Sequence, residues 1–286
     1  MDGLASSSTG GGANNQGLAH TAAGRLASPL IADRLRLVVE GANVRANPPE
    51  GAAIRNSVGG GLRYEGPDVQ ATVRALANFG TLERVSAGGT LAWQPDDRWS
   101  FALDGEYFSL ETPLRALLYG ITANSLGASA AWRRDEGLRI GTLLGWMDFS
   151  DGNTRWAGGL NLQAGLVAQP HFRLTGLADL YSSTNSQPGG PYFAPSFDLS
   201  LSLGFEAQHI AWRRYERILT QVLMVNAGPY WQRDYGGTWI GTLAYEHRWR
   251  RDPWRELFYG VTLTRRVYDG DPERTVAAVA GLRQAF

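Results

Sequence analysis

Apolar and polar residues alternate along most of this chain, and this period-two pattern limits the folds that it can adopt. The segment FDLSLSLGFEAQ (197–208) is apolar at its odd positions and polar or glycine at its even ones. SFALDGEYFSL (100–110) and LFYGVTLTRR (257–266) show a similar alternation. Successive side chains of a β-strand point to opposite faces, whereas a helix would repeat every three or four residues. The pattern therefore predicts an all-β fold.

Turn-forming clusters of glycine, proline and aspartate separate the alternating segments. A further strand is possible at Asp2–Thr9, before the turn GGGANNQG (10–17), and would bring the total to sixteen. The segment LETPLRALLYGI (110–121) is the exception, because it favours a short helical turn within a loop. We expect the other strands at residues 17–27, 33–46, 52–65, 69–79, 82–94, 98–110, 121–134, 138–149, 154–168, 171–183, 196–212, 215–232, 237–250, 254–267 and 273–286.

The composition supports a large β-structure with many turns. The 286 residues include 36 glycines, 10 tryptophans and 11 tyrosines, and no cysteine. A chain without cysteine has no disulfides and no cysteine metal site. The 27 basic residues, all of them arginine, balance 27 acidic ones, so bulk charge gives no reason to expect a nucleic-acid partner.

The hydropathy pattern excludes a transmembrane helix but leaves a transmembrane β-barrel open. The chain has no apolar run as long as such a helix needs, and its mean hydropathy is −0.25. Barrel strands alternate apolar and polar residues, which averages to a bland hydropathy. The first 26 residues lack the apolar stretch of a signal peptide, as expected of a mature fragment.

The connections between the expected strands differ in length on the two sides of the sheet. Turns such as EGPD (65–68) and AQPH (168–171) are short, whereas SLETPLRALLYG (109–120) and STNSQPGGPYFAPS (183–196) lie on the other side and are long. This asymmetry is typical of outer-membrane barrels, and only closed barrels let strands satisfy their backbone in lipid. We expect a 16-stranded antiparallel outer-membrane β-barrel over residues 17–286, after an N-terminal segment (1–16) that holds the possible first strand.

In such a barrel the apolar row faces lipid and the polar row faces the lumen. Tryptophans toward the strand ends would then form girdles at the membrane interfaces. These tryptophans are Trp93, Trp132, Trp146, Trp239 and Trp249. The alternative is that they belong to the core of a large soluble β-protein.

Three linked motifs near the C-terminus resemble one known family. They are PYFAPSFD (191–198), the run YW…YGGTWIG…YEHRW between Tyr230 and Trp249, and RRVYDGDPE (265–273). Together they resemble the C-terminal barrel of the poly-β-1,6-N-acetyl-D-glucosamine export porin family (PgaA/HmsH) of biofilm-forming Gram-negative bacteria. The resemblance is strongest over residues 191–286, and elsewhere it consists of strand number and pattern.

The resemblance implies a monomeric barrel that carries a partly deacetylated exopolysaccharide through its lumen to the cell surface. It also implies contact with outer-membrane lipid. A periplasmic polymer deacetylase would be met through an N-terminal helical-repeat domain, which we do not expect within this chain. A cellulose-type exporter, a general porin and a soluble carbohydrate-binding β-protein remain as alternatives.

A glucosamine chain that slides through a pore needs weak, repeated contacts with acidic groups, hydroxyls and aromatic faces. By alternation, the pore-lining candidates are Glu40, Asp104, Glu106, Asp179, Asp198, Glu206, Glu246, Glu256, Arg248 and Arg266. The alternative is that many of the carboxylates simply pair with lumen arginines. Those arginines are expected at Arg36, Arg63, Arg74, Arg84, Arg139, Arg173, Arg248, Arg266 and Arg283.

Loop residues provide candidates for the extracellular mouth of the pore. They are Tyr192, Phe193, Tyr235, Tyr268, Asp269 and Asp271. The alternative for all of them is packing within the loops.

The sequence gives little support for an enzyme. The four histidines are scattered, without metal-ligand spacing, and no serine stands out beside His247 as a lipase nucleophile. Asp104 and Glu106 lie ~7 Å apart by strand geometry, which a glycosidase would allow, but charged lumens produce such pairs routinely. We therefore expect no catalysis, no cofactor and no metal.

Overall fold

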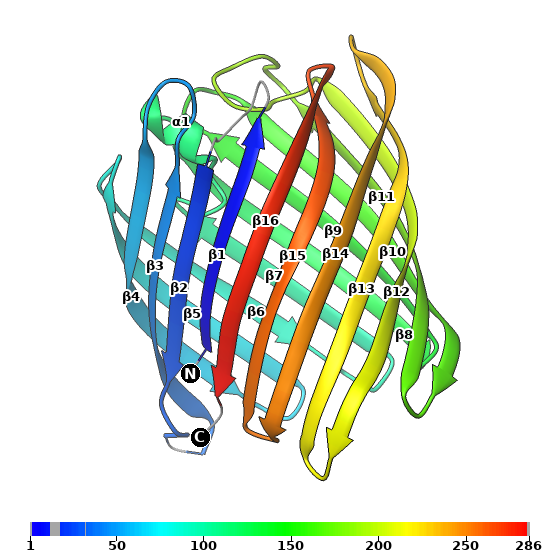
Figure 1. Cartoon of the computed structure of the whole chain (residues 1–286). Helices are drawn as coiled ribbons and strands as arrows, with labels where there is room; N and C mark the ends of the chain where they lie inside the picture. Colours follow the sequence, from blue (N-terminus) through cyan, green and yellow to red (C-terminus); the bar gives the residue numbers. More distant parts are fainter. Residues whose placement is uncertain (1, 12–17, 32, 285–286) are drawn as a thin grey trace.

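The computed structural model describes residues 2–11, 18–31 and 33–284. Within these residues the chain forms sixteen strands and one short helix (Figure 1). The strands are β1 (Asp2–Gly11), β2 (Leu18–Ala27), β3 (Leu35–Ala46), β4 (Ala53–Glu65), β5 (Val69–Gly80), β6 (Arg84–Trp93), β7 (Trp99–Tyr107), β8 (Ala123–Asp135), β9 (Leu138–Phe149), β10 (Thr154–Gln169), β11 (Phe172–Asn185), β12 (Phe197–Arg214), β13 (Arg217–Gln232), β14 (Gly236–Asp252), β15 (Arg255–Tyr268) and β16 (Asp271–Gln284).

All strands belong to one antiparallel sheet. Each strand pairs with the strands before and after it, and β1 pairs with both β2 and β16, which closes the sheet on itself. The expected all-β, antiparallel architecture is confirmed, and the possible strand at Asp2–Thr9 is β1. Residues 12–17, which hold most of the turn expected at 10–17 and the domain boundary expected after residue 16, lie outside the described residues. Residue 286, where the last strand was expected to end, also lies outside them.

The helix α1 (Leu114–Leu118) is the helical turn expected within residues 110–121. It follows Pro113, and its Leu114, Ala116 and Leu117 are buried. None of the helical structure in the described part of the chain is long and apolar enough to cross a membrane.

The two ends of the barrel differ. The described chain begins and ends at one of them, the terminus end, while α1 lies at the opposite one, the loop end (Figure 1). Two long connections lie at the loop end: residues 108–122, here the helix loop, and residues 186–196, here the proline loop. The terminus end has mostly short turns, such as residues 136–137 and 170–171. The predicted asymmetry of the connections is therefore present.

The outer surface of the barrel is apolar. Along β5, Val73 points outward and is 60% exposed, whereas Leu76 points inward and is 3% exposed. Along β14, Trp239, Leu243 and Trp249 belong to the outward row and are all more than 40% exposed. Large apolar side chains exposed in continuous rows are not stable in water, and they mark a surface that contacts lipid or protein.

Glycines allow a close approach of β4 and β5 in the barrel wall. A Cβ atom at Gly61 would lie 2.0 Å from the carbonyl oxygen of Val73, and one at Gly59 would lie 2.1 Å from that of Ala75. No side chain fits at these distances, so the run of glycines at 59–61 is required by the close approach of the two strands.

If the outward row faces lipid, a charged residue should lower the free energy of unfolding more on the outer face than on the inner face. We expect Val73→Arg to lower the free energy of unfolding by about 2–4 kcal/mol, because the guanidinium would lie in hydrocarbon near the middle of a strand. Thr72→Arg is the matched control, since Thr72 faces the lumen one residue away. Urea unfolding in lipid vesicles measures both variants, and equal costs would contradict the assignment of the faces.

Candidate functional site in the barrel lumen

The polar face of the strands lines the lumen. Arg74 of β5 forms ion pairs with Glu40 of β3 and with Glu106 of β7. Neither β3 nor β7 is paired with β5, so these side chains reach across the strand between them on the inner side of the curved wall. The strand register carries this face around the barrel. It includes Glu40, Asp104, Glu106, Asp179, Asp198, Glu206, Glu246, Glu256, Arg248 and Arg266. The structure thus brings the candidates to one surface, and their role in transport stays a prediction.

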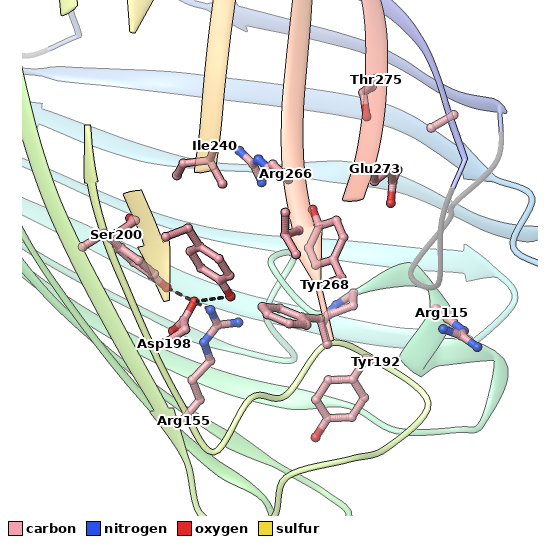
Figure 2. A pocket seen from close by; sticks show the side chains of 16 residues that line it. Arg115, Arg155, Tyr192, Asp198, Ser200, Ile240, Arg266, Tyr268, Glu273 and Thr275 are labelled. Carbon is pink, nitrogen blue, oxygen red and sulfur yellow. Dashed lines mark hydrogen bonds between the residues drawn. The ribbon is translucent and has the colours of Figure 1, made fainter. Parts of the chain in front are cut away.

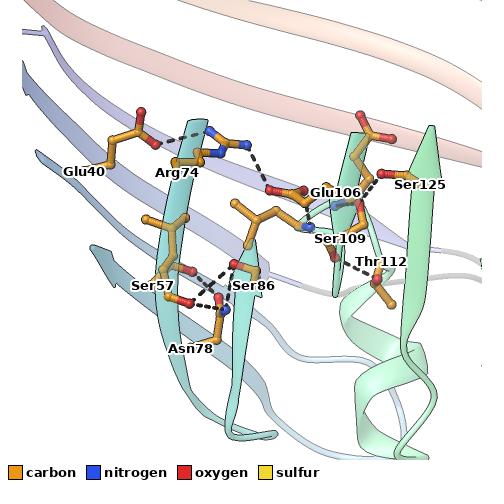
Figure 3. Close-up of polar contacts among 12 residues, drawn as sticks. Glu40, Ser57, Arg74, Asn78, Ser86, Glu106, Ser109, Thr112 and Ser125 are labelled. Atoms are coloured by element: carbon orange, nitrogen blue, oxygen red, sulfur yellow. Dashed lines mark hydrogen bonds and ion pairs between the residues drawn. The ribbon is translucent and has the colours of Figure 1, made fainter. Parts of the chain in front are cut away.

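An alternating chain of charges crosses the wall from β2 to β7 (Figure 3). Glu40 lies between Arg25, at 3.1 Å, and Arg74, also at 3.1 Å. Arg74 then contacts Glu106 at 3.0 Å. The second carboxylate oxygen of Glu106 accepts a hydrogen bond from the backbone N–H of Leu110, at 2.8 Å. The chain of charges therefore ends on the helix loop.

Two other lumen carboxylates also form ion pairs with arginine. Glu246 pairs with Arg248, and Glu256 pairs with Arg283 at 2.9 Å. Pairing with arginine is therefore what the structure shows for four of the candidates, Glu40, Glu106, Glu246 and Glu256. Within the described residues, Asp104, Asp179, Asp198 and Glu206 form no ion pair. The lumen is thus mixed in sign.

Arg55 of β4 holds the helix loop inside the barrel. Its side chain is 6% exposed, and its guanidinium donates hydrogen bonds to the backbone carbonyl oxygens of Ser109, Leu110 and Thr112. The bond to Ser109 is 3.3 Å long. Five donors in a planar fork suit a guanidinium to bind several carbonyls of one loop at once.

Apolar packing completes the attachment of the helix loop. Phe108, Leu114 and Leu117 pack against Ala46 and Ala53, on the inner face of β3 and β4. Phe108 adopts a positive φ of 50°, which turns the chain inward at the end of β7. The helix loop is therefore folded into the loop end of the lumen and does not extend from it.

The proline loop folds inward beside the helix loop. Tyr192 stacks on Phe149 with ring centroids 4.7 Å apart, and both pack against Ala116 of α1. The Tyr192 hydroxyl accepts a hydrogen bond from Asn153 and donates one to Asp151, each 3.0 Å long. Burial raises the pKa of Tyr192 to about 12, so the hydroxyl keeps its proton at neutral pH.

The candidate mouth residues divide between packing and exposure. Tyr192 is buried, and Phe193 contacts Tyr268 edge to face with centroids 4.9 Å apart. Asp269 exchanges two hydrogen bonds with Gln232 of β13. Tyr235 is exposed at 54%. Asp271 is also exposed. Loop packing, the alternative reading, therefore describes Tyr192 and Asp269.

Sequence reasoning missed several lumen residues. Arg25, Arg55, Arg155, Tyr230 and Glu273 all lie on the inward face, and alternation would have placed each of them there. The contacts of Arg55 with a loop more than 50 residues away left no signal in the sequence.

The histidine considered as a lipase residue lies on the outer face of β14. His247 lies on the outward face, where its ring nitrogens hydrogen-bond to the hydroxyls of Tyr245 and Tyr259, each at 2.9 Å. Among the described residues, no group of three or more histidine and acidic side chains is placed to hold a metal ion.

Comparison with known families decides what kind of barrel this is. The family model for the PgaA membrane beta barrel domain matches residues 1–286. The chain belongs to this family. The resemblance inferred from the C-terminal motifs is thus confirmed and extends over the whole chain. Membership also confirms the expected outer-membrane localisation.

Curated relatives agree with this assignment. The poly-beta-1,6-N-acetyl-D-glucosamine export protein of Escherichia coli (strain K12) is 32% identical over 184 residues, which are 63% of this chain and 22% of that protein. The protein of the same name from Escherichia coli O157:H7 gives the same values. The match therefore spans about a fifth of the length of these relatives.

Solved structures share the fold. A bacterial polysaccharide outer membrane secretin superimposes with a TM-score of 0.91 at 23% identity, over 100% of this chain and 98% of that one. An anion-selective porin from Comamonas acidovorans gives a TM-score of 0.52 at 10% identity, also over 100% of this chain and 98% of that one.

The attachment of the helix loop predicts an effect on conductance. We expect Arg55→Ala to release the loop and raise the conductance of single barrels in planar bilayers several-fold, because each lost hydrogen bond to a charged group is worth about 1.5–3 kcal/mol. Arg84→Ala is the control, since Arg84 also faces the lumen at the loop end but has no side-chain bond to this loop within the described residues. An unchanged conductance in Arg55→Ala would show that the loop does not narrow the pore.

A second attachment of the helix loop is sensitive to pH. Arg115 of α1 pairs with Glu50 in the β3–β4 turn, and this hydrogen bond lowers the pKa of Glu50 below its ordinary value of 4.5. A lowered carboxyl pKa means that the contact is fully present above 4.5 and is lost as pH falls through the lowered value. We expect open events in single-channel records to become more frequent in that acidic range. Glu50→Gln should remove this pH dependence, and its persistence in that variant would assign it to another group.

Proposed function

We propose that this chain is the membrane barrel of an outer-membrane exporter, and that poly-β-1,6-N-acetyl-D-glucosamine, partly deacetylated, passes through its lumen. The observation that carries the proposal is the family membership, together with the export function that gives the Escherichia coli relatives their name. The closed sixteen-stranded barrel supplies a route in which the polymer never meets lipid.

The lumen suits a polymer that must move without being trapped. Lumen arginines neutralise much of the acidic charge, so a partly cationic chain meets no deep electrostatic well. Hydroxyl and amide groups such as Ser57, Asn78 and Ser86 form a hydrogen-bonded row across β4, β5 and β6 (Figure 3). These side chains are buried and bonded to one another, so this part of the wall presents few unpaired polar groups that could trap a passing sugar.

The two inward loops act in this proposal as the closure of the resting pore. They occupy the loop end, which faces the cell surface, and polymer arriving from the terminus end would displace them. A periplasmic polymer deacetylase would deliver the chain, docking on a helical-repeat domain of the whole exporter. The barrel itself performs no chemistry and works as a monomer without a cofactor.

Block of ion current by oligosaccharides tests the function. We expect β-1,6-linked glucosamine oligomers, added at the terminus end of Arg55→Ala barrels in planar bilayers, to interrupt the current in a length-dependent way. β-1,4-linked glucose oligomers of equal length are the control. Block by the β-1,4-linked oligomers alone would favour a cellulose-type exporter, and no block by either would favour a general porin.

A further inference from the structure

A cavity of about 730 Å³ lies at the loop end of the lumen (Figure 2). Its volume falls within the ~300–1,000 Å³ of small-molecule sites. It is bounded by the inner faces of β10 to β16, by Ala19 of β2, by the proline loop, and by Pro113 and Arg115 of the helix loop. Its polar and aromatic lining includes Arg155, Asp198, Tyr230, Arg266, Tyr268 and Glu273.

Glu273 stands out among the residues that line this cavity. It is only 8% exposed, and its Oε2 atom has no hydrogen-bond partner within the described part of the chain, while the same carboxyl group interacts with the Thr275 side chain and with the charge of Arg266. Arg266 lies opposite it in the register of β15 and β16, but the two form no ion pair within 4.0 Å. A buried acceptor without a donor is costly, and in native structures such an atom calls for an explanation.

Asp198 and Arg155, two other charged groups of the cavity, are already engaged with neighbouring groups of the protein. Asp198 accepts hydrogen bonds from the backbone and hydroxyl of Ser183 and from the Tyr230 hydroxyl. Arg155 donates to the hydroxyls of Tyr181 and Ser183. These contacts hold β10 to β13 together at the loop end. Glu273 is therefore the carboxylate of this cavity that is left to bind a donor from outside the protein.

Aromatic rings line the same cavity as Glu273. Tyr268 lies two residues beyond Arg266, the strand partner of Glu273, and contacts Phe193 of the proline loop edge to face. Tyr192 and Tyr230 add two further rings to the same cavity. Rings of this kind offer flat faces to a sugar and attract a cation placed over them.

From these observations we propose that the cavity is a subsite for one glucosamine unit, whose protonated 2-amino group donates a hydrogen bond to Oε2 of Glu273 while aromatic rings cover the sugar. A charge-assisted hydrogen bond is roughly twice as strong as a neutral one, so the site distinguishes a free amine from an acetamide. This inference rests on the proposed export function, because it names the unit of the polymer that the mouth of the pore binds. The site would hold deacetylated units at the exit until the next units displace them.

Calorimetric titration of the whole chain in detergent tests the subsite. The ligands are a β-1,6-linked glucosamine trisaccharide and its fully N-acetylated counterpart, in a mildly acidic buffer that protonates the amine. We expect the amine form to bind about tenfold more tightly to the unmodified chain, and Glu273→Gln to remove that preference while keeping the affinity for the acetylated form.

Glu136→Gln is the control, because it removes an exposed carboxylate from the β8–β9 turn at the terminus end. Unchanged conductance of Glu273→Gln in planar bilayers shows that the barrel has folded. An equal preference for the amine in Glu273→Gln, or no preference in the unmodified chain, overturns the subsite.

The two proposals fail separately. If cells that carry Glu273→Gln still release polymer and the unmodified chain shows no amine preference, the subsite is wrong and the export function stands. If the amine preference depends on Glu273 but cells that carry the unmodified chain in the whole exporter release no polymer, the subsite stands and the export function is wrong.

Discussion

The need to pair every backbone N–H and C=O group in lipid governs the whole structure. A bilayer core offers no water to these groups, and an open sheet would leave two edges unpaired. Here β1 pairs with β16 as well as with β2, so the sheet has no free edge. Once the sheet is closed, the alternation of side chains sets one row against lipid and the other against the lumen. The alternation of lipid-facing and lumen-facing residues in the sequence thus follows from the pairing of the backbone hydrogen bonds in a closed sheet.

The charges inside the barrel follow from the same geometry. The paired carboxylates of the inner wall meet arginines on the same, the adjacent or the next-adjacent strand. Arg74 lies between two carboxylates and Glu40 between two arginines, so each of these two charges is offset on both sides. Individual ion pairs of this partly exposed kind are worth little, about 0–1 kcal/mol. The arrangement therefore sets the sign of the surface that a polymer meets more than it stabilises the fold.

Strands and faces could be read from the sequence, because both depend on residues two positions apart. The register of β14 with β13 and β15 places Glu246 and Arg248 inward and Trp239 and Trp249 outward, as alternation predicts. The helical turn of α1 could also be read, but its position inside the barrel could not. That position depends on Arg55, whose partners lie in residues 109–112, and on contacts with Ala46 and Ala53. Such contacts join distant parts of the chain and have no period.

The two sides of the loop end differ in how the inward loops are held, and this difference affects how a polymer would leave the pore. On the side of β3 to β8, the helix loop is fixed to the wall by Arg55, by Glu106 and by an apolar cluster. On the side of β12 to β16, the wall is instead hollowed into the cavity that contains Glu273. The proline loop lies between the two, with Tyr192 packed toward the helix loop and Phe193 toward Tyr268. Because Pro113 and Arg115 of the helix loop also line this cavity, a polymer that passes Glu273 meets both inward loops. In the proposed export both loops are therefore displaced, and the hydrogen bonds of Arg55 are what holds the helix loop back.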